Sequence, residues 1–197
     1  VVSIELGDER NRSFIRVGTN PWRRERLRRR SVGIVVRDGT VLSSPRPPLW
    51  AIAFPDGTVS SAVIVPQKEF VVRAHTTSAI AEASVVSGGF FPLVLAGRTV
   101  AERYPGSNSR DARVAIAVDE DDPKRAVAVI AVEGSTPLVS GVTTLELAAF
   151  LAEEGFEWAL NVDGGHSSTV LVPGYPTYPR GFLIRRTGPV RLVFRAP

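Results

Sequence analysis

The stretch Ala159–Val172, ALNVDGGHSSTVLV, joins two apolar runs through a short polar segment. The first run ends in Asn161 and Asp163, and two glycines, a histidine and two serines follow before the second run begins. Apolar runs of this length, bounded by glycine and polar residues, are typical of β-strands joined by a turn. The loop is therefore either a tight turn alone or a reaction site that needs a turn to hold it.

A helix precedes this stretch in the sequence. Thr143 and Glu146 match the Thr-x-x-Glu capping box, and the apolar residues that follow recur at helical spacing. Gly155 suits the position just beyond a helix, where a left-handed backbone costs glycine little. We predict a helix over 143–154, followed by a strand over 156–162 that leads into the loop.

Short β-rich runs fill most of the remaining chain. Asp38-Gly39 and Pro55-Asp56-Gly57 favour tight turns and predict two hairpins, and Ala96-Gly97 predicts a small hairpin within 93–100. A short helix is expected over 76–82, and a polar loop over 102–112. Further strands are expected over 2–6, 14–17, 32–37, 40–42, 49–54, 58–65, 69–73, 84–87, 113–118, 126–132, 182–184 and 190–194.

These elements predict an α+β fold. We expect a mixed, largely antiparallel β-sheet built from hairpins, with one main helix, about 143–154, packed on it. No internal repeat and no strong linker divides the sequence. Residues 1–30 are expected to form an N-terminal extension that is part of the same fold, and residues 31–197 the main domain.

The composition limits the possible classes of protein. Of the 197 residues, 44% are hydrophobic and 22% are charged, which is typical of a globular domain. No apolar run is long enough to predict a transmembrane helix. The absence of Cys excludes disulfides, thiol nucleophiles and Cys-ligated zinc. Because the chain begins with Val and contains no Met, we expect a processed or trimmed chain whose leader is not visible.

An arginine-rich segment lies near the N-terminus. Arg23–Arg30, RRERLRRR, contains six arginines and one glutamate. The segment either binds an anionic polymer, lipid or nucleic acid, or is a solvated part of the surface. No interleaved aromatic residues and no recognised nucleic-acid motif accompany it, so a nucleic-acid partner is not expected.

The polar loop carries residue types that are suited to catalysis and anion binding. Asp163 can act as an acid, a base, a nucleophile or a metal ligand, and His166 can transfer a proton near neutral pH. Gly164 and Gly165 allow the backbone to approach a ligand closely, and successive N–H groups can form a concave anion site. Hydroxyl donors follow at Ser167 and Ser168. No ligand spacing demands a metal, and no cofactor is expected.

Other segments supply further candidates. The run 87–91, SGGFF, ends a strand in two glycines; its aromatic residues can stack on a sugar or simply fill the core. Arg113, at the start of RVAIAV, can hold a phosphate through paired hydrogen bonds. The capping box alone explains Glu146. His75 is expected to be a surface or hydrogen-bonded residue. Possible second carboxylates are Glu82, Asp111 and Glu133.

Taken in order, the segments SGGFF, RVAIAV and GVTTLELAAFLAEEGFEWALNVDGGHSSTVLV resemble the phosphodiester glycosidase family. That family includes the enzyme that uncovers mannose 6-phosphate by removing N-acetylglucosamine from a phosphodiester. The resemblance covers about residues 84–195, and the last segment is its most specific part. It implies a phosphodiester glycosidase-like domain in a secreted or cell-envelope (periplasmic) protein.

The resemblance also implies a reaction and its residues. The chain is expected to be a hydrolase that cleaves a sugar-1-phosphodiester or a related envelope glycan, with the phosphate held by Arg113 and the 163–168 loop. A carboxylate would stabilise or attack the oxocarbenium-like centre. The catalytic candidates are Asp163, Glu146 and His166. The substrate- and phosphate-binding candidates are Arg113, Gly88, Gly89, Phe90, Asn161, Gly164, Gly165, Ser167 and Ser168.

The sequence departs from the family pattern at four positions. Ser87 stands where Asn is usual, and Val114 and Ala117 replace Thr and Gly. His166 replaces the third glycine of the loop, which would narrow the pocket, add a proton donor, change the substrate or abolish activity. The alternative function is therefore a non-catalytic module that binds a sugar phosphate or an anionic glycan. A third possible function is that of an envelope-surface scaffold whose segment Arg23–Arg30 binds an anionic polymer.

Overall fold

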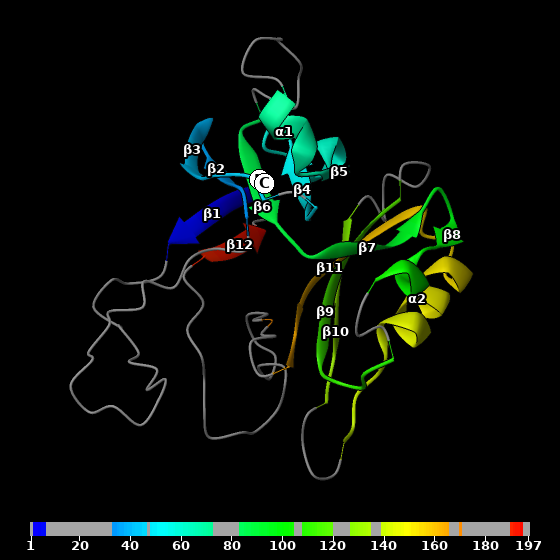
Figure 1. Cartoon of the computed structure of the whole chain (residues 1–197). Coiled ribbons are helices and arrows are strands. Elements are labelled where there is room, and N and C mark those ends of the chain that lie inside the picture. Colours follow the sequence, from blue (N-terminus) through cyan, green and yellow to red (C-terminus); the bar gives the residue numbers. More distant parts are fainter. Residues whose placement is uncertain are drawn as a thin grey trace, which may run out of the picture.

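The computed structural model describes residues 2–6, 33–46, 48–72, 83–104, 108–119, 127–134, 139–165, 170 and 190–194. Within these residues the chain forms two five-stranded antiparallel sheets, a two-stranded pair and two α-helices (Figure 1). The predicted α+β fold, largely antiparallel and with one main helix packed on a sheet, is confirmed.

The first sheet has the strand order β3-β2-β6-β4-β5. Asp38 and Gly39, which connect β2 and β3, have φ angles of 50° and 72°. Positive φ at both central residues is what a tight hairpin turn requires, so this predicted hairpin is confirmed. The strands are β2 (Val35–Arg37), β3 (Thr40–Ser43), β4 (Trp50–Phe54), β5 (Val63–Pro66) and β6 (Val85–Gly88).

The second sheet has the strand order β10-β9-β11-β7-β8, with β11 at its centre. The predicted hairpin at Ala96-Gly97 is confirmed, because it joins β7 to β8 and both residues have positive φ. The central strand runs further than predicted, to Gly164. The strands are β7 (Phe91–Leu95), β8 (Arg98–Thr99), β9 (Arg113–Val118), β10 (Val127–Val132) and β11 (Trp158–Gly164).

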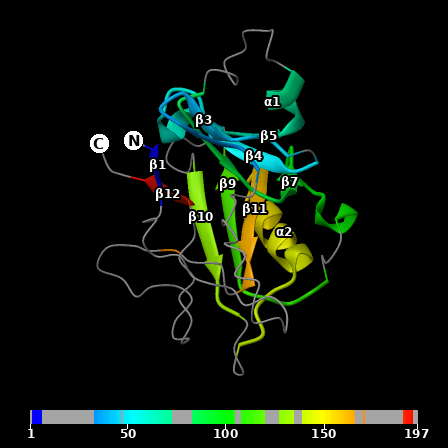
Figure 2. The same cartoon turned by 60° about the vertical axis from the view of Figure 1, so that its left-hand side comes forward.

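The main helix, α2 (Thr144–Glu153), packs on the outer face of the second sheet (Figures 1 and 2). Thr143 caps it, and the predicted capping box with Glu146 is confirmed. Side chains alternate between the two faces of each strand. Small alanines face α2, which lets the helix approach closely, and larger residues face the first sheet. The alanines are Ala115, Ala117 and Ala159; the larger residues are Ile116, Val118 and Leu160.

The two sheets pack face to face through these larger residues, with Ile52 and Phe54 among their partners in the first sheet. A short helix, α1 (Lys68–Val72), covers the outer face of the first sheet through Phe70. The order of layers is therefore α1, first sheet, second sheet, α2 (Figure 2). Strands β1 (Val2–Leu6) and β12 (Val190–Phe194) pair with each other beside the core between the sheets.

Two further predicted strands differ from the structure. The segment 69–73 was expected to be a strand, but residues 68–72 form α1, because Phe70 is needed to cover the outer face of the first sheet. The strand expected over 58–65 begins only at Val63, because a 3-10 turn occupies Val59–Ser61. Asp56 accepts hydrogen bonds from the backbone and hydroxyl of Thr58, and such local bonds compete with strand pairing.

Other expectations fall beyond the described residues, namely the strands over 14–17 and 182–184 and the helix over 76–82. Of the expected N-terminal extension, the structure describes only residues 2–6. The division into an extension and a main domain stays a prediction.

Candidate functional site

The chain passes from the first sheet to the second through Gly88, Gly89 and Phe90, and there it touches β11. The backbone N–H of Phe90 donates to the carbonyl of Asn161 at 2.9 Å, and that of Gly89 donates to the carbonyl of Trp50 at 2.8 Å. A Cβ on Gly89 would lie 2.7 Å from Leu160 Cδ2. This close approach requires glycine, and it brings three of the predicted site residues against a fourth, Asn161.

Asn161 lies in the middle of the second sheet, opposite Phe91 of β7 and Ala115 of β9. Its side chain is buried, and the carboxamide Oδ1 has no hydrogen-bond partner among the residues that the structure describes. Buried polar atoms are normally paired, and an unpaired one costs about 1–3 kcal/mol. Asn161 Oδ1 is therefore suited to accept a hydrogen bond from a ligand hydroxyl.

The end of β11 contains an irregularity in its pairing with β9. Asn161 is opposite Ala115, whereas Asp163 is opposite Val114, so one extra residue is inserted between them. Such bulges bend a strand and are frequent beside active sites. The backbone of Asp163 thus belongs to the strand and not to the loop after it.

The two loop glycines make room for two charged side chains. A Cβ on Gly164 would lie 2.8 Å from Arg113 Nη1, and a Cβ on Gly165 would lie 2.9 Å from Asp111 Oδ2. The backbone N–H of Gly165 also donates to the carbonyl of Ala112 at 2.8 Å. The structure therefore brings a guanidinium and a carboxylate together over the Gly-Gly pair.

Asp111 was only one of three possible second carboxylates in the sequence. The available signal was its spacing of two residues from Arg113, which places both on one side of an extended chain. The sequence did not show that this segment is held by tight backbone contacts. Asp111 forms a bridge with Val142, and a Cβ on Gly134 would lie 2.5 Å from the backbone nitrogen of Ala112.

The guanidinium of Arg113 is held by two backbone carbonyls. Nη2 donates to Ser109 at 2.6 Å and Nε donates to Val142 at 3.5 Å, just before α2 begins. These bonds use two of the five N–H donors of an arginine. The group is thus oriented by the backbone, and its remaining donors suit a bound oxyanion.

Glu146 serves as a helix cap and an ion-pair partner. Its Oε2 accepts from the backbone N–H of Thr143 at 2.9 Å and from its hydroxyl at 3.1 Å, and its Oε1 accepts from Arg110. The backbone hydrogen bond from Thr143 and the charge of Arg110 lower the pKa of Glu146. A carboxylate with a lowered pKa is a poor proton donor near neutral pH. A catalytic role for Glu146 stays a prediction.

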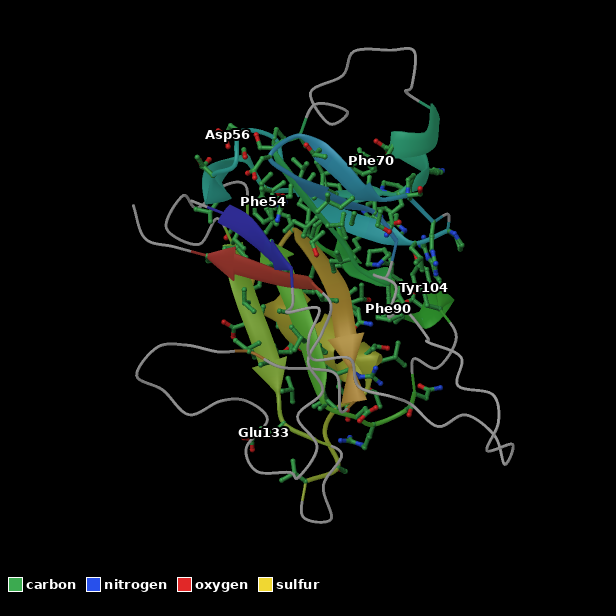
Figure 3. All side chains as sticks on the ribbon, turned by 90° about the vertical axis from the view of Figure 1, so that its left-hand side faces the viewer. Phe54, Asp56, Phe70, Phe90, Tyr104 and Glu133 are labelled. Atoms are coloured by element: carbon green, nitrogen blue, oxygen red, sulfur yellow. The ribbon has the colours of Figure 1, made fainter. Side chains whose placement is uncertain are left out.

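Several predicted residues lie outside the described part of the chain: His75, Glu82, His166, Ser167, Ser168 and the segment Arg23–Arg30. Glu133 follows β10 at one end of the second sheet (Figure 3). The described residues contain no group of three or more His, Cys, Asp or Glu that could hold a metal ion. Among the helices of these residues, none has the length and apolar character needed to span a membrane.

Comparison with known proteins agrees with the resemblance in the sequence. The catalytic domain of zebrafish N-acetylglucosamine-1-phosphodiester alpha-N-acetylglucosaminidase, auto-inhibited by pro-peptide, has a similar fold, with a TM-score of 0.60 and 17% identity. That match covers 84% of this chain and 58% of the zebrafish chain. A hypothetical protein from Synechocystis matches with a TM-score of 0.36 and 20% identity, over 69% of this chain and 28% of that one.

No curated protein sequence matches this chain. A model of the phosphodiester glycosidase family matches residues 10–193, which is most of the chain. This match includes the β6–β7 junction, Arg113, α2 and the whole of β11. The chain therefore belongs to the phosphodiester glycosidase family.

Proposed function

We propose that this protein is a hydrolase that cleaves a sugar-1-phosphodiester or a related envelope glycan. The observation that carries the proposal is the placement of Arg113 and Asp111 over Gly164, the last residue of β11, and Gly165, which follows it, in a chain of this family. A guanidinium and a carboxylate at one glycine pair supply the two kinds of group that the reaction needs.

The phosphate end of the substrate binds at Arg113. A guanidinium whose orientation is fixed by two carbonyls loses little entropy when it binds an oxyanion. Gly165 has a φ of 65°, and a left-handed residue in such a turn helps to aim backbone N–H groups at an anion. By their place in the family pattern, Ser167 and Ser168 add hydroxyl donors.

The sugar end needs a carboxylate at the anomeric carbon. Water adds its oxygen to that carbon, the bond to the phosphate oxygen breaks, and a carboxylate stabilises or traps the oxocarbenium-like centre. Because a phosphate monoester is a good leaving group, little acid assistance is required. Asp163 is the first candidate for this role, and Asp111 is the second.

A synthetic methyl diester of N-acetylglucosamine 1-phosphate tests the proposal, because the zebrafish protein is named for that class of bond. Asp163→Asn should lower kcat by about a hundredfold or more, as expected for the loss of a catalytic group. Asp38→Asn is the matched control, because Asp38 lies in an exposed hairpin turn. If Asp111→Asn abolishes turnover and Asp163→Asn does not, the two carboxylates exchange roles.

The alternative is a module that binds a sugar phosphate without cleaving it. It is favoured by His166, which stands where the family has a third glycine. Calorimetry with N-acetylglucosamine 1-phosphate, run beside an assay for released sugar, separates the two functions. Binding without release contradicts the hydrolase and supports the module.

A further inference from the structure

An aromatic stack lies beside the candidate site. Tyr104, which follows the 3-10 turn Ala101–Arg103, stacks on Phe91 with ring centroids 4.7 Å apart and an angle of 12° between the planes. Burial raises the pKa of the Tyr104 hydroxyl. Tyr104 is nevertheless only half-buried, so one of the rings of the stack is accessible from the surface.

This stack and the buried carboxamide lie on one face of the second sheet. Phe91 and Asn161 are directly opposite each other in the β7–β11 pair, and directly opposite residues share a face. Both point to the α2 side, because Phe91 packs at the margin of the cluster beneath that helix. Figure 3 shows Tyr104 and Phe90 near each other at the margin of this sheet.

The guanidinium of Arg113 lies on the same face of the second sheet. Arg113 alternates with Ala115 and Ala117, which face α2, and its Nε reaches the carbonyl of Val142 just before that helix. Strands in a sheet are about 4.8 Å apart, so β7 and β9, on either side of β11, are separated by about 10 Å. Arg113 lies two residues, about 7 Å, further along β9 than Ala115, which is opposite Asn161. An aromatic ring, a carboxamide oxygen and a guanidinium thus lie along one face of the second sheet.

We propose that Tyr104, supported by Phe91, is the sugar-binding platform of this site. The C–H groups on one face of a pyranose carry partial positive charge, and the face of an aromatic ring is negative, so the two attract. A hydroxyl of the stacked sugar donates to Asn161 Oδ1, and the phosphate lies towards Arg113. The assignment of the phosphate end rests on the proposed function; the platform itself rests on the ring geometry.

The support behind Tyr104 favours a rigid platform over an accidental surface ring. Stacking on Phe91 fixes the plane of the ring. A ring that is held in this way loses little entropy when a ligand binds. A nucleobase is the other flat group that would use such a ring, but the neighbouring orphan acceptor suits the hydroxyls of a sugar.

Calorimetry on the full chain tests the platform without requiring turnover. The probes are N-acetylglucosamine 1-phosphate, glucose 1-phosphate, uridine monophosphate and inorganic phosphate. Tyr104→Leu keeps an apolar side chain but removes the flat ring, Tyr104→Phe keeps the ring and removes the hydroxyl, and Phe150→Leu is the control. Phe150 is an aromatic residue that is 49% exposed on α2, and it takes no part in the stack.

We expect Tyr104→Leu to weaken binding of at least one sugar 1-phosphate about tenfold, which corresponds to ~1.4 kcal/mol. Inorganic phosphate should bind equally well to the wild type and to all three variants, and Tyr104→Phe should stay within about threefold of the wild type for sugar. A melting curve for each variant shows that the fold is intact.

The outcomes distinguish the platform from the proposed function. Equal sugar binding by Tyr104→Leu and the wild type overturns the platform, as does an equal loss for inorganic phosphate. A wild type that binds uridine monophosphate more tightly than either sugar phosphate assigns the ring to a base and also overturns it. Sugar binding that depends on Tyr104, in a protein that does not cleave the diester, supports the platform and contradicts the hydrolase.

Discussion

At the residue scale, Gly164, the last residue of β11, and Gly165, which follows it, are required for two different reasons. Gly165 has a φ of 65°, a backbone that other residues adopt at a cost, and the Asp111 carboxylate also occupies the space that its Cβ would take. Gly164 is constrained by space alone, since the guanidinium of Arg113 lies against it. The glycines of this turn are thus required by the neighbouring side chains of Arg113 and Asp111 as much as by the backbone conformation.

The capping carboxylate of α2 gives a prediction of pH dependence. The pKa of Glu146 is lowered from its ordinary value of 4.5, chiefly by the backbone N–H of Thr143. A lowered pKa in the folded state means that the carboxylate stabilises the fold fully above its unfolded pKa. This contribution is lost as the pH falls through the folded pKa.

Glu146→Gln keeps an oxygen for the capping box but removes the charge that faces Arg110. The variant should melt at a lower temperature than the wild type at pH 7, and the two melting temperatures should converge as the pH falls through the folded pKa of Glu146. Glu153→Gln removes the same charge from the same helix without touching Thr143 or Arg110. A difference that does not shrink at all as the pH falls far below 4.5 would contradict this account of Glu146.

At the element scale, the elements that could be predicted are those whose signals are local. The capping box fixed the start of α2, and positive-φ turns fixed the hairpins at Asp38-Gly39 and Ala96-Gly97. Helix α1 was missed because its run of apolar and β-branched residues resembles a strand, and only the uncovered face of the first sheet makes it helical. Asp111 could be suspected but not placed, because long-range backbone packing at Gly134 sets its position.

The junction between β6 and β7 gives a prediction about packing. Gly89→Ala adds a methyl group 2.7 Å from Leu160 Cδ2, which is too close for either group. Overpacking of this kind should destabilise the protein by about 1–3 kcal/mol in urea unfolding. Leu160→Val removes the clashing end of the side chain and should itself cost about 1–2 kcal/mol, because Leu160 is fully buried.

The double variant is the control for this mechanism. If the clash causes the loss, Gly89→Ala with Leu160→Val should be more stable than the sum of the single changes predicts, by about 1 kcal/mol. Strict additivity would mean that the backbone carbonyl of Asn161, 3.2 Å from the added methyl, is the real obstacle.

At the scale of the whole molecule, the candidate site depends on segments from distant parts of the chain. The β6–β7 junction, the start of β9, the N-terminus of α2 and the end of β11 meet only because β11 lies at the centre of the second sheet. Sequence motifs identified most of these segments one by one. Their order across the sheet follows from strand pairing that no local pattern specifies. The same pairing places Tyr104, Asn161 and Arg113 on one face of the sheet.

The two ends of the described chain also meet, and this contact gives the last prediction. β1 pairs with β12 over five residues. In β12, Leu192 packs on the core between the sheets. The ring of Phe194 packs edge to face on the ring of Phe54, with the ring centroids 6.0 Å apart. Removing residues 1–6 takes away the pairing partner of β12 and loosens both contacts. With a few backbone hydrogen bonds lost at a net ~1 kcal/mol each, the deletion should lower the free energy of unfolding by about 2–5 kcal/mol. Urea unfolding measures this loss, and Ser3→Thr, which preserves the strand, should leave stability within about 0.5 kcal/mol of the wild type. A deletion as stable as the wild type would show that β12 holds its place on the core without β1.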